Sequence, residues 1–229
     1  DWRAAEIAAE LRRRYGAPDS AARDWVSTGY IADPLAGAPV EKRALPELEL
    51  KLPSTGSGLR VSLDLLVLDS RWSRQRIEQA VQQAFMILAQ CELVPGEISI
   101  HSISADDYLR DLSTGTARTL FEAVGTPGPS VVFARDTLMQ AAYLGEAFGL
   151  GNTRMRPWLA NSVWLMLDVE DAGIALAHEL YHVLANSGAH VEGVANLMQP
   201  RTRPESVALT TEQCRLAQVN GIENQLLQD

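Results

Sequence analysis

The chain of 229 residues has few basic side chains, few histidines and no long hydrophobic run. Its 20 Lys and Arg are outnumbered by 29 Asp and Glu, giving a net charge of −9, so we expect no nucleic-acid partner. No apolar stretch reaches the roughly 20 residues that span a bilayer, which excludes a transmembrane helix. Internal repeats are also absent, which excludes the repeat architectures.

Cysteine is scarce as well, because the chain has only Cys91 and Cys214. One disulfide would suit an exported protein and two buried free thiols a cytosolic one, so the count alone fixes no compartment. Spacing does not show whether the two pair. A chain that starts at Asp1 without a signal peptide is read as a processed or trimmed form. The missing leader itself says little about location. We expect a secreted or periplasmic protein, with a cytoplasmic location left open.

What is present suits one globular domain, since 46% of residues are hydrophobic and 21% are charged. Five prolines loosen residues 16–58, and a Pro-Ser-Thr-Gly-Ser-Gly break closes that segment. We therefore divide the chain into an N-terminal extension, residues 1–58, and a main domain, residues 59–229. Alternating leucines in 48–52 predict a short half-exposed strand within the extension.

Hydrophobic periodicity predicts a mixed helix and strand order in the main domain. A helix of about five turns begins near Ile77 and ends near Pro95-Gly96. The last helix opens with a capping box formed by Thr210 and Gln213. The remaining expected elements are strands at 61–67, 98–103, 130–134 and 163–167, a partly helical stretch at 106–124, a glycine-rich extended segment at 143–152 and a helix at 171–185.

The helix at 171–185 is apolar nearly all round, yet it contains His178, Glu179 and His182. The run His178-Glu-Leu-Tyr-His182 matches the H-E-x-x-H zinc motif. Residues four apart share a helix face, so both imidazoles can reach one ion. Glu179 is placed to act as general base on a water at that ion. A chance match on a solvated helix is the alternative, and the apolar surroundings argue against it.

A catalytic zinc usually has three protein ligands, and His190 is the natural third. Three of the four histidines of the chain fall within thirteen residues. Asn186, Ser187 and Gly188 lie between them and can end the helix, which would let the chain double back to present His190. His101 stands alone in an expected strand, where we expect a structural role.

At these residues the sequence resembles the metzincin clan of zinc peptidases, whose motif is H-E-x-x-H-x-x-G-x-x-H followed by a methionine turn. Asn196-Leu-Met-Gln-Pro200 resembles that turn, and a Met with a Pro two residues later is similar to the matrixin branch. The resemblance implies that Met198 underlies the metal ligands and that Pro200 belongs to the turn. An ordinary core methionine is the alternative reading of Met198.

The spacing departs from the clan pattern at two points. Ala185 stands where the family has glycine, and His190 lies eight residues after His182 instead of six. Leishmanolysin-like metzincins accept an insertion at this point. Glu192 and Glu205 are the fallback third ligands, and Glu205 would resemble the gluzincin arrangement.

The resemblance implies an α+β fold with a twisted, mixed five-stranded sheet, an antiparallel edge strand, a long backing helix, a zinc-binding helix and a C-terminal helix. An upper part, 59–186, and a lower part, 187–229, would enclose the cleft. The edge strand, with Gly145, Ala147 and Gly149, would bind an extended substrate through its backbone.

The implied activity is that of a zinc metalloendopeptidase acting on a polypeptide substrate, and it needs one catalytic zinc. A binding protein that keeps the fold without turnover is the alternative.

Residues 1–58 read as a packed extension. Because Asp or Cys keeps some relatives latent, an inhibitory pro-segment using Asp24 or Asp33 is the other reading. Calcium is conceivable at Asp106, Asp107 and Asp111, or at Asp168, Glu170 and Asp171, but neither group has EF-hand spacing; the second group suits a helix cap.

Overall fold

The architecture comes from a computed structural model that describes residues 39–52, 58–112, 116–125, 129–138, 145–149 and 157–228. Asp24 and Asp33, proposed above as latency ligands, lie outside the described residues. The division into an extension, residues 1–58, and a main domain stays a prediction. Residues 39–52, by contrast, are described and lie against the main domain.

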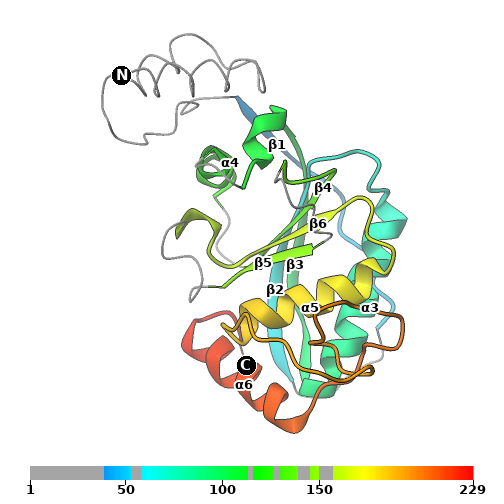
Figure 1. Cartoon of the computed structure of the whole chain (residues 1–229). Coiled ribbons are helices and arrows are strands. Elements are labelled where there is room, and N and C mark those ends of the chain that lie inside the picture. The colour runs from blue at the N-terminus through cyan, green and yellow to red at the C-terminus, as the bar shows by residue number, and fades with distance from the viewer. Residues whose placement is uncertain are drawn as a thin grey trace, which may run out of the picture.

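A six-stranded sheet forms the centre of the protein, in the order β1-β3-β2-β4-β6-β5 (Figure 1). Its inner pairs are parallel, whereas β1 on β3 and β5 on β6 are antiparallel. The predicted mixed sheet with an antiparallel edge strand is confirmed, with one strand more than expected. The strands are β1 (Val40–Ala44), β2 (Leu59–Val67), β3 (Leu93–Ala105), β4 (Ser130–Ala134), β5 (Gly145–Phe148) and β6 (Ser162–Met166).

The additional strand is β1, which pairs with β3 from Val40 opposite Ala105 to Ala44 opposite His101. The half-exposed strand expected at 48–52 does not form, since these residues have no regular secondary structure. Their leucines nevertheless pack against the main hydrophobic core. The alternating leucines therefore indicated that one side of this irregular segment is buried. The same alternation is typical of a strand, so the pattern alone cannot distinguish the two.

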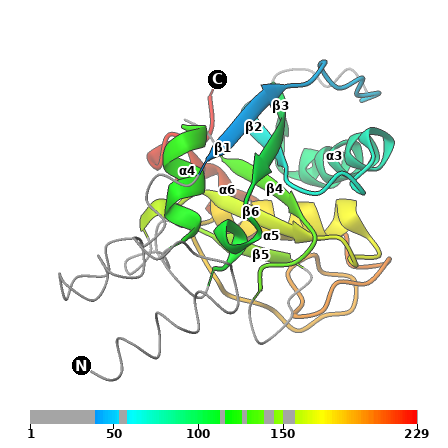
Figure 2. The same cartoon turned by 90° about the horizontal axis from the view of Figure 1, so that it is seen from above.

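Side chains of β2 alternate between the two faces of the sheet, as the strand pattern requires. Val61, Leu63 and Leu65 join the larger core, which α3 and α5 cover, whereas Leu66 belongs to a second cluster with residues of α4. Strands β4 and β6 are buried along their whole length because both faces are covered. Figure 2 shows α3 and α4 on opposite sides of the sheet.

The long backing helix, α3 (Arg74–Leu88), is capped by the Ser73 side chain, which accepts a hydrogen bond from the Arg76 amide. It is shorter than predicted, because a single 3-10 turn, η1 (Ala89–Cys91), follows it. Glu92 then takes a left-handed backbone conformation with φ 55° and turns the chain into β3. Pro95 and Gly96 therefore lie inside β3 and do not end the helix, which corrects the predicted boundary.

In the described ranges, the remaining helices are α4, α5 and α6, together with short 3-10 turns. The zinc-motif helix, α5 (Ala172–Leu184), packs against α3, and α6 (Thr211–Glu223) closes the bottom of the molecule in Figure 1. The predicted capping box of Thr210 and Gln213 is present at the start of α6. The partly helical stretch resolves into η2 (Asp107–Arg110) and α4 (Ala117–Val124), and η4 (Pro157–Leu159) precedes β6.

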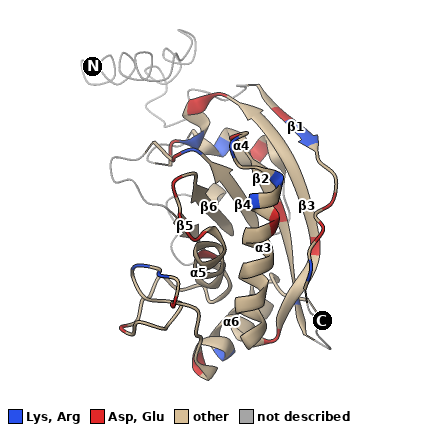
Figure 3. Cartoon of the chain, turned by 90° about the vertical axis from the view of Figure 1, so that its right-hand side faces the viewer, with Lys and Arg blue, Asp and Glu red and all other residues tan. Residues whose placement is uncertain are grey.

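A disulfide joins Cys91, the last residue of η1 after α3, to Cys214 in the first turn of α6. The sequence left this pairing open. Figure 3 shows basic and acidic segments scattered over strands, helices and loops. None of the described helices is long and apolar enough to cross a membrane.

Candidate metal centre

Helix α5 carries the site, and every one of its residues except Glu179 is buried. Its apolar surface faces α3 on one side and the sheet on the other, so the helix is fixed in place before any ligand binds. Asp171 takes the N-cap position, but its side chain makes no capping hydrogen bond. Asp171 thus places a negative charge at the N-terminus of α5, as expected, although it caps the helix without a side-chain hydrogen bond.

The ring nitrogens of three histidines converge below α5. The Nε2 atoms lie 3.0 Å apart for His178 and His182, 3.2 Å apart for His178 and His190, and 3.3 Å apart for His182 and His190. Nitrogen ligands of a tetrahedral zinc, each about 2.0–2.1 Å from the ion, lie about 3.3 Å from one another. Within the described part of the chain, this is the only group of His, Cys, Asp or Glu arranged to hold a metal ion.

The positions of the ring protons explain why the Nε2 atoms of His178 and His182 favour a bound cation. Nδ1 of His178 lies 2.7 Å from the Leu197 carbonyl oxygen, and Nδ1 of His182 lies 2.6 Å from the Ser187 carbonyl oxygen. A carbonyl only accepts, so each Nδ1 carries the proton and each Nε2 presents a lone pair. Two lone pairs at 3.0 Å cannot hydrogen-bond to each other, whereas a shared metal ion satisfies both.

Burial keeps these rings neutral. It lowers the pKa of His178 to about 4, against the opposing effect of the Leu197 hydrogen bond, and the neighbouring His182 and His190 lower it further. Burial likewise lowers the pKa of His182. A neutral imidazole is the form that binds a metal, so both rings are ready as ligands at neutral pH.

His190 reaches the other two rings because α5 ends abruptly. Asn186 takes a left-handed conformation with φ 48°, and its amide bonds the Val183 carbonyl while the Ser187 amide bonds the His182 carbonyl. These two bonds form a Schellman motif, which reverses the chain. The predicted turn at Asn186 to Gly188 is thus present, and it accommodates the two additional residues before His190.

Glu179 projects from α5 toward the edge strand. A Cβ atom built on Gly145 of β5 would lie 2.9 Å from Oε1 of Glu179. Glu179 is half-buried as a residue, but its carboxyl group is enclosed; this burial, and to a lesser degree the charge of Glu146, raises the pKa of Glu179 to about 8. The carboxyl group therefore occupies a confined space between helix and strand, on the residue next to His178.

The edge strand lies directly over α5. Added Cβ atoms at Gly145 and Gly149 would meet Glu179 and Asn186 respectively, and Ala147 packs against the larger core. The small residues that the sequence assigns to substrate binding therefore allow a close approach of strand and helix. Binding of a substrate through their backbone stays a prediction.

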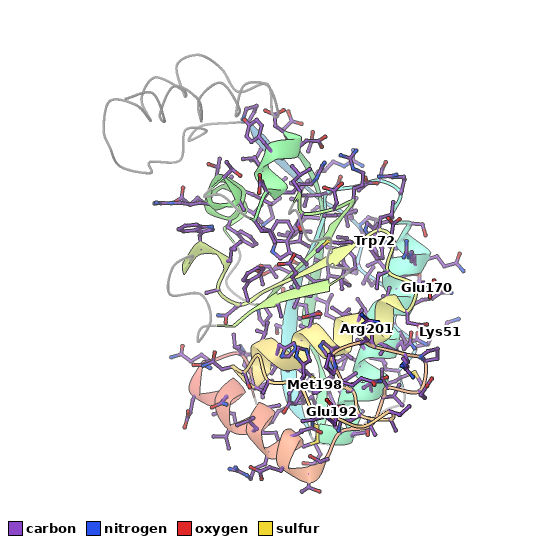
Figure 4. All side chains as sticks on the ribbon, in the orientation of Figure 1. Lys51, Trp72, Glu170, Glu192, Met198 and Arg201 are labelled. Atoms are coloured by element: carbon purple, nitrogen blue, oxygen red, sulfur yellow. A yellow bond between two sulfur atoms is a disulfide. The ribbon has the colours of Figure 1, made fainter. Side chains whose placement is uncertain are left out.

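The segment after His190 returns beneath the histidines. Met198 is buried, with 1% of its surface exposed, and it lies with Glu192 on the lower side of α5 (Figure 4). The Leu197 carbonyl oxygen bonds His178, as noted above, and the Met198 carbonyl oxygen accepts a hydrogen bond of 2.9 Å from the Val191 amide. No sequence motif could name these carbonyl groups, because any residue type supplies one.

The other candidate ligands lie apart from the cluster. Glu192 and Glu205 are exposed, and neither belongs to the group that can hold an ion. His101 sits in β3 beside Ser99, with Nε2 3.1 Å from Oγ, as expected for a structural histidine. Pro200 is exposed at the end of the turn. Asp107 forms ion pairs with Arg110 and Arg135, so the first acidic group is partly neutralised.

Comparison with known proteins gives one kind of match. No protein-family model matches the sequence, and no curated protein matches it. Among solved structures, metalloproteinase-II from Bacteroides fragilis is similar with a TM-score of 0.53 at 16% identity, covering 95% of this chain and 69% of that one. This likeness shows the fold. A metalloproteinase-like fold and a cluster of three histidines that could hold a metal are therefore established together.

Replacing Gly145 with Ala is expected to displace the Glu179 carboxylate, because the new methyl group would overlap it. If Glu179 acts on the substrate water, a shift of about 1 Å should lower the rate of hydrolysis by roughly 10²-fold. Zinc content and melting temperature should stay at the wild-type values. Gly188→Ala is the matched control, since an added Cβ there meets nothing within 4 Å; equal rates for the two variants would contradict the placement of Glu179.

Proposed function

We propose that the protein is a zinc-dependent endopeptidase in which His178, His182 and His190 hold the metal and Glu179 is the general base. The observation that carries this proposal is the convergence of three Nε2 atoms, two of which present lone pairs to one another. The metalloproteinase-like fold supports it independently. Three neutral imidazoles are a ligand set that suits zinc, and a zinc ion held there would activate water and polarise a carbonyl group.

Glu179 would move the proton in this reaction. Its carboxylate follows His178 on the same helix and faces the edge strand, where the scissile bond would lie. It takes a proton from the attacking water and later delivers that proton to the leaving amine.

The substrate would be an extended polypeptide. Within the described ranges, β5 pairs with β6 and stands last in the strand order of the sheet. The resemblance to the metzincins supports a substrate that lies along β5 and binds it through backbone hydrogen bonds. The segment that carries Met198 and Pro200 would then form the opposite side of the cleft, as in the metzincins that the sequence resembles.

We also propose that the protein works in an oxidising compartment, as a secreted or periplasmic enzyme. The Cys91–Cys214 disulfide supports this location, because disulfides persist where the cytosolic reducing systems are absent. Cell fractionation followed by alkylation of free thiols would test it. Detection of both cysteines as free thiols in the native protein would contradict the proposal.

Metal content and proteolysis measured on the same sample test the activity. We expect one zinc per chain after dialysis, cleavage of casein, and loss of cleavage with a chelator that zinc restores. Bound zinc without cleavage of casein or of a diverse peptide library would favour a binding protein instead. Absence of zinc binding would refute the proposed metal site itself.

The third ligand can be tested separately. His190→Ala is expected to weaken zinc binding by more than the factor of about 10 to 100 that follows loss of an outer hydrogen-bond partner, because a direct bond to the ion is lost. Glu192 is the alternative third ligand, exposed and two residues from His190, so Glu192→Gln is the matched control and should leave zinc binding unchanged. If Glu192→Gln weakens zinc binding and His190→Ala does not, the ligand assignment is wrong.

A further inference from the structure

We infer that Gln213, together with Asn196, is a positioning residue for the metal site. Gln213 lies in the first turn of α6 and touches none of the three histidines. It acts through the turn of residues 196–198, which holds His178 and the chain next to His190. The inference rests on the metal site of the proposed function, and it assigns to the C-terminal helix a task beyond closing the fold.

The side chain of Gln213 forms a two-way amide pair with Asn196. Its Nε2 donates to Oδ1 of Asn196 at 3.0 Å, and its Oε1 accepts from Nδ2 of Asn196 at 2.9 Å. The same Oε1 accepts the Thr210 amide at 2.8 Å as part of the capping box. Capping requires only the acceptor, so the Nε2 donor is used for Asn196 alone.

Asn196 transmits this contact to the turn. Its Oδ1 also accepts a hydrogen bond of 2.8 Å from the Met198 amide. Leu197 lies between Asn196 and Met198, and its amide donates a hydrogen bond of 2.8 Å to the Ala208 carbonyl oxygen. Because Gln213 fixes which way the Asn196 amide group points, it determines whether an acceptor faces Met198.

Two of the three proposed ligands depend on this turn. The Leu197 carbonyl oxygen lies 2.7 Å from Nδ1 of His178 and so fixes both the tautomer and the orientation of that ring. The Met198 carbonyl oxygen accepts the amide of Val191, which follows His190, at 2.9 Å. A rotation of the peptide groups in the turn would therefore move His178 and His190 together.

The position of Gln213 is itself fixed from two sides. Its carbonyl oxygen accepts a hydrogen bond of 3.3 Å from the hydroxyl group of Tyr181, which lies in α5 between the two helical histidines. The next residue, Cys214, is covalently joined to Cys91 in η1, the 3-10 turn that continues from α3. The first turn of α6 is thus tied to both helices that frame the site, so it can serve as a rigid support.

The Gln213→Glu variant tests the contact with Asn196 while it keeps the N-terminal cap of α6. Glu occupies the same position in capping boxes, so α6 should still form. One carboxylate oxygen would, however, face Oδ1 of Asn196 with no donor between them, which would turn the Asn196 amide away from Met198. The matched control is Gln218→Glu, the same change on the same helix, where the Gln218 Nε2 atom donates to the Cys91 carbonyl oxygen at 2.8 Å.

The experiment measures zinc affinity of the full-length metal-free chain by competition with a chromophoric chelator, alongside the absorption spectrum of the Co²⁺-loaded protein. We expect Gln213→Glu to weaken zinc binding by about 10- to 100-fold and to change the Co²⁺ spectrum. Gln218→Glu should preserve both, at a comparable melting temperature. Equal zinc affinities for Gln213→Glu and wild type, or an equal loss in Gln218→Glu, would overturn the inference.

A double-mutant cycle addresses the route through Asn196. Asn196→Ala should weaken zinc binding by itself, and Gln213→Glu should add little in that background, since its effect requires Asn196. Fully additive losses would overturn the inference and leave the proposed metal site intact. If the wild-type chain binds no zinc at all, the metal site and the inference are both refuted.

Discussion

Replacement of Glu179 by Gln is expected to lower the rate of peptide hydrolysis by about 10³-fold, within the range that general acid–base groups contribute. Glutamine keeps the size of the side chain and its place beneath Gly145, but it cannot accept a proton from water. Zinc affinity should be retained, because Glu179 is not among the three side chains that converge. Steady-state cleavage of a fluorogenic peptide and zinc content per chain would be measured together.

Glu170→Gln is the matched control for this change. Glu170 is exposed and precedes α5, so the substitution removes the same charge outside the site (Figure 4). Its hydrolysis rate should equal that of the wild type. Retained cleavage by the Glu179→Gln variant, at full zinc content, would show that another group takes the proton.

Removal of the disulfide by Cys91→Ala with Cys214→Ala is expected to be the most destabilising change outside the site. The bridge closes a separation of 123 residues, and the chain-entropy relation for a loop of that length gives about 5 kcal/mol at most. A loss of about 2–5 kcal/mol in the free energy of unfolding is therefore expected. Urea unfolding of the metal-free chain, followed by fluorescence and circular dichroism, would measure it.

Reduction of the wild-type protein provides the control, since it opens the bridge without removing atoms from the core around Cys91, which is 1% exposed. The reduced wild type and the double variant should lose similar stability, apart from the cost of the truncated side chains. Because Cys214 follows Gln213, both should also bind zinc more weakly. Unchanged stability after reduction would show that packing alone fixes α6.

The sequence determined the local parts of the site. The spacing of His178 and His182 places both rings on one face of any helix, and the apolar residues around them require that helix to be buried. The capping box of Thr210 and Gln213 follows from residue types three apart, and it is present. These features depend on contacts within a few residues, which a single sequence specifies.

The boundaries of strands and helices, and the irregular segments beside them, were harder to predict. The alternation at 48–52 indicated a strand, yet the neighbouring segment β1 formed the sixth strand on β3. Pro95 and Gly96 indicated the end of α3, but α3 ended at Leu88 and the left-handed Glu92 ended the 3-10 turn that follows it. Local pattern gives the burial of a segment, whereas pairing partners decide whether it joins the sheet.

Only the tertiary structure brought His190 to the other two histidines and Cys91 to Cys214. The first result needs the left-handed turn at Asn186 and the bond from Val191 to Met198, and the second needs α3 and α6 to meet. The carbonyl groups that orient His178 and His182 belong to Leu197 and Ser187, whose side chains carry no signal of that task. The sequence by itself determined the chemistry of the histidine and glutamate motif. The distances that make it a candidate metal site depend on packing between residues far apart in the chain, which no local rule encodes.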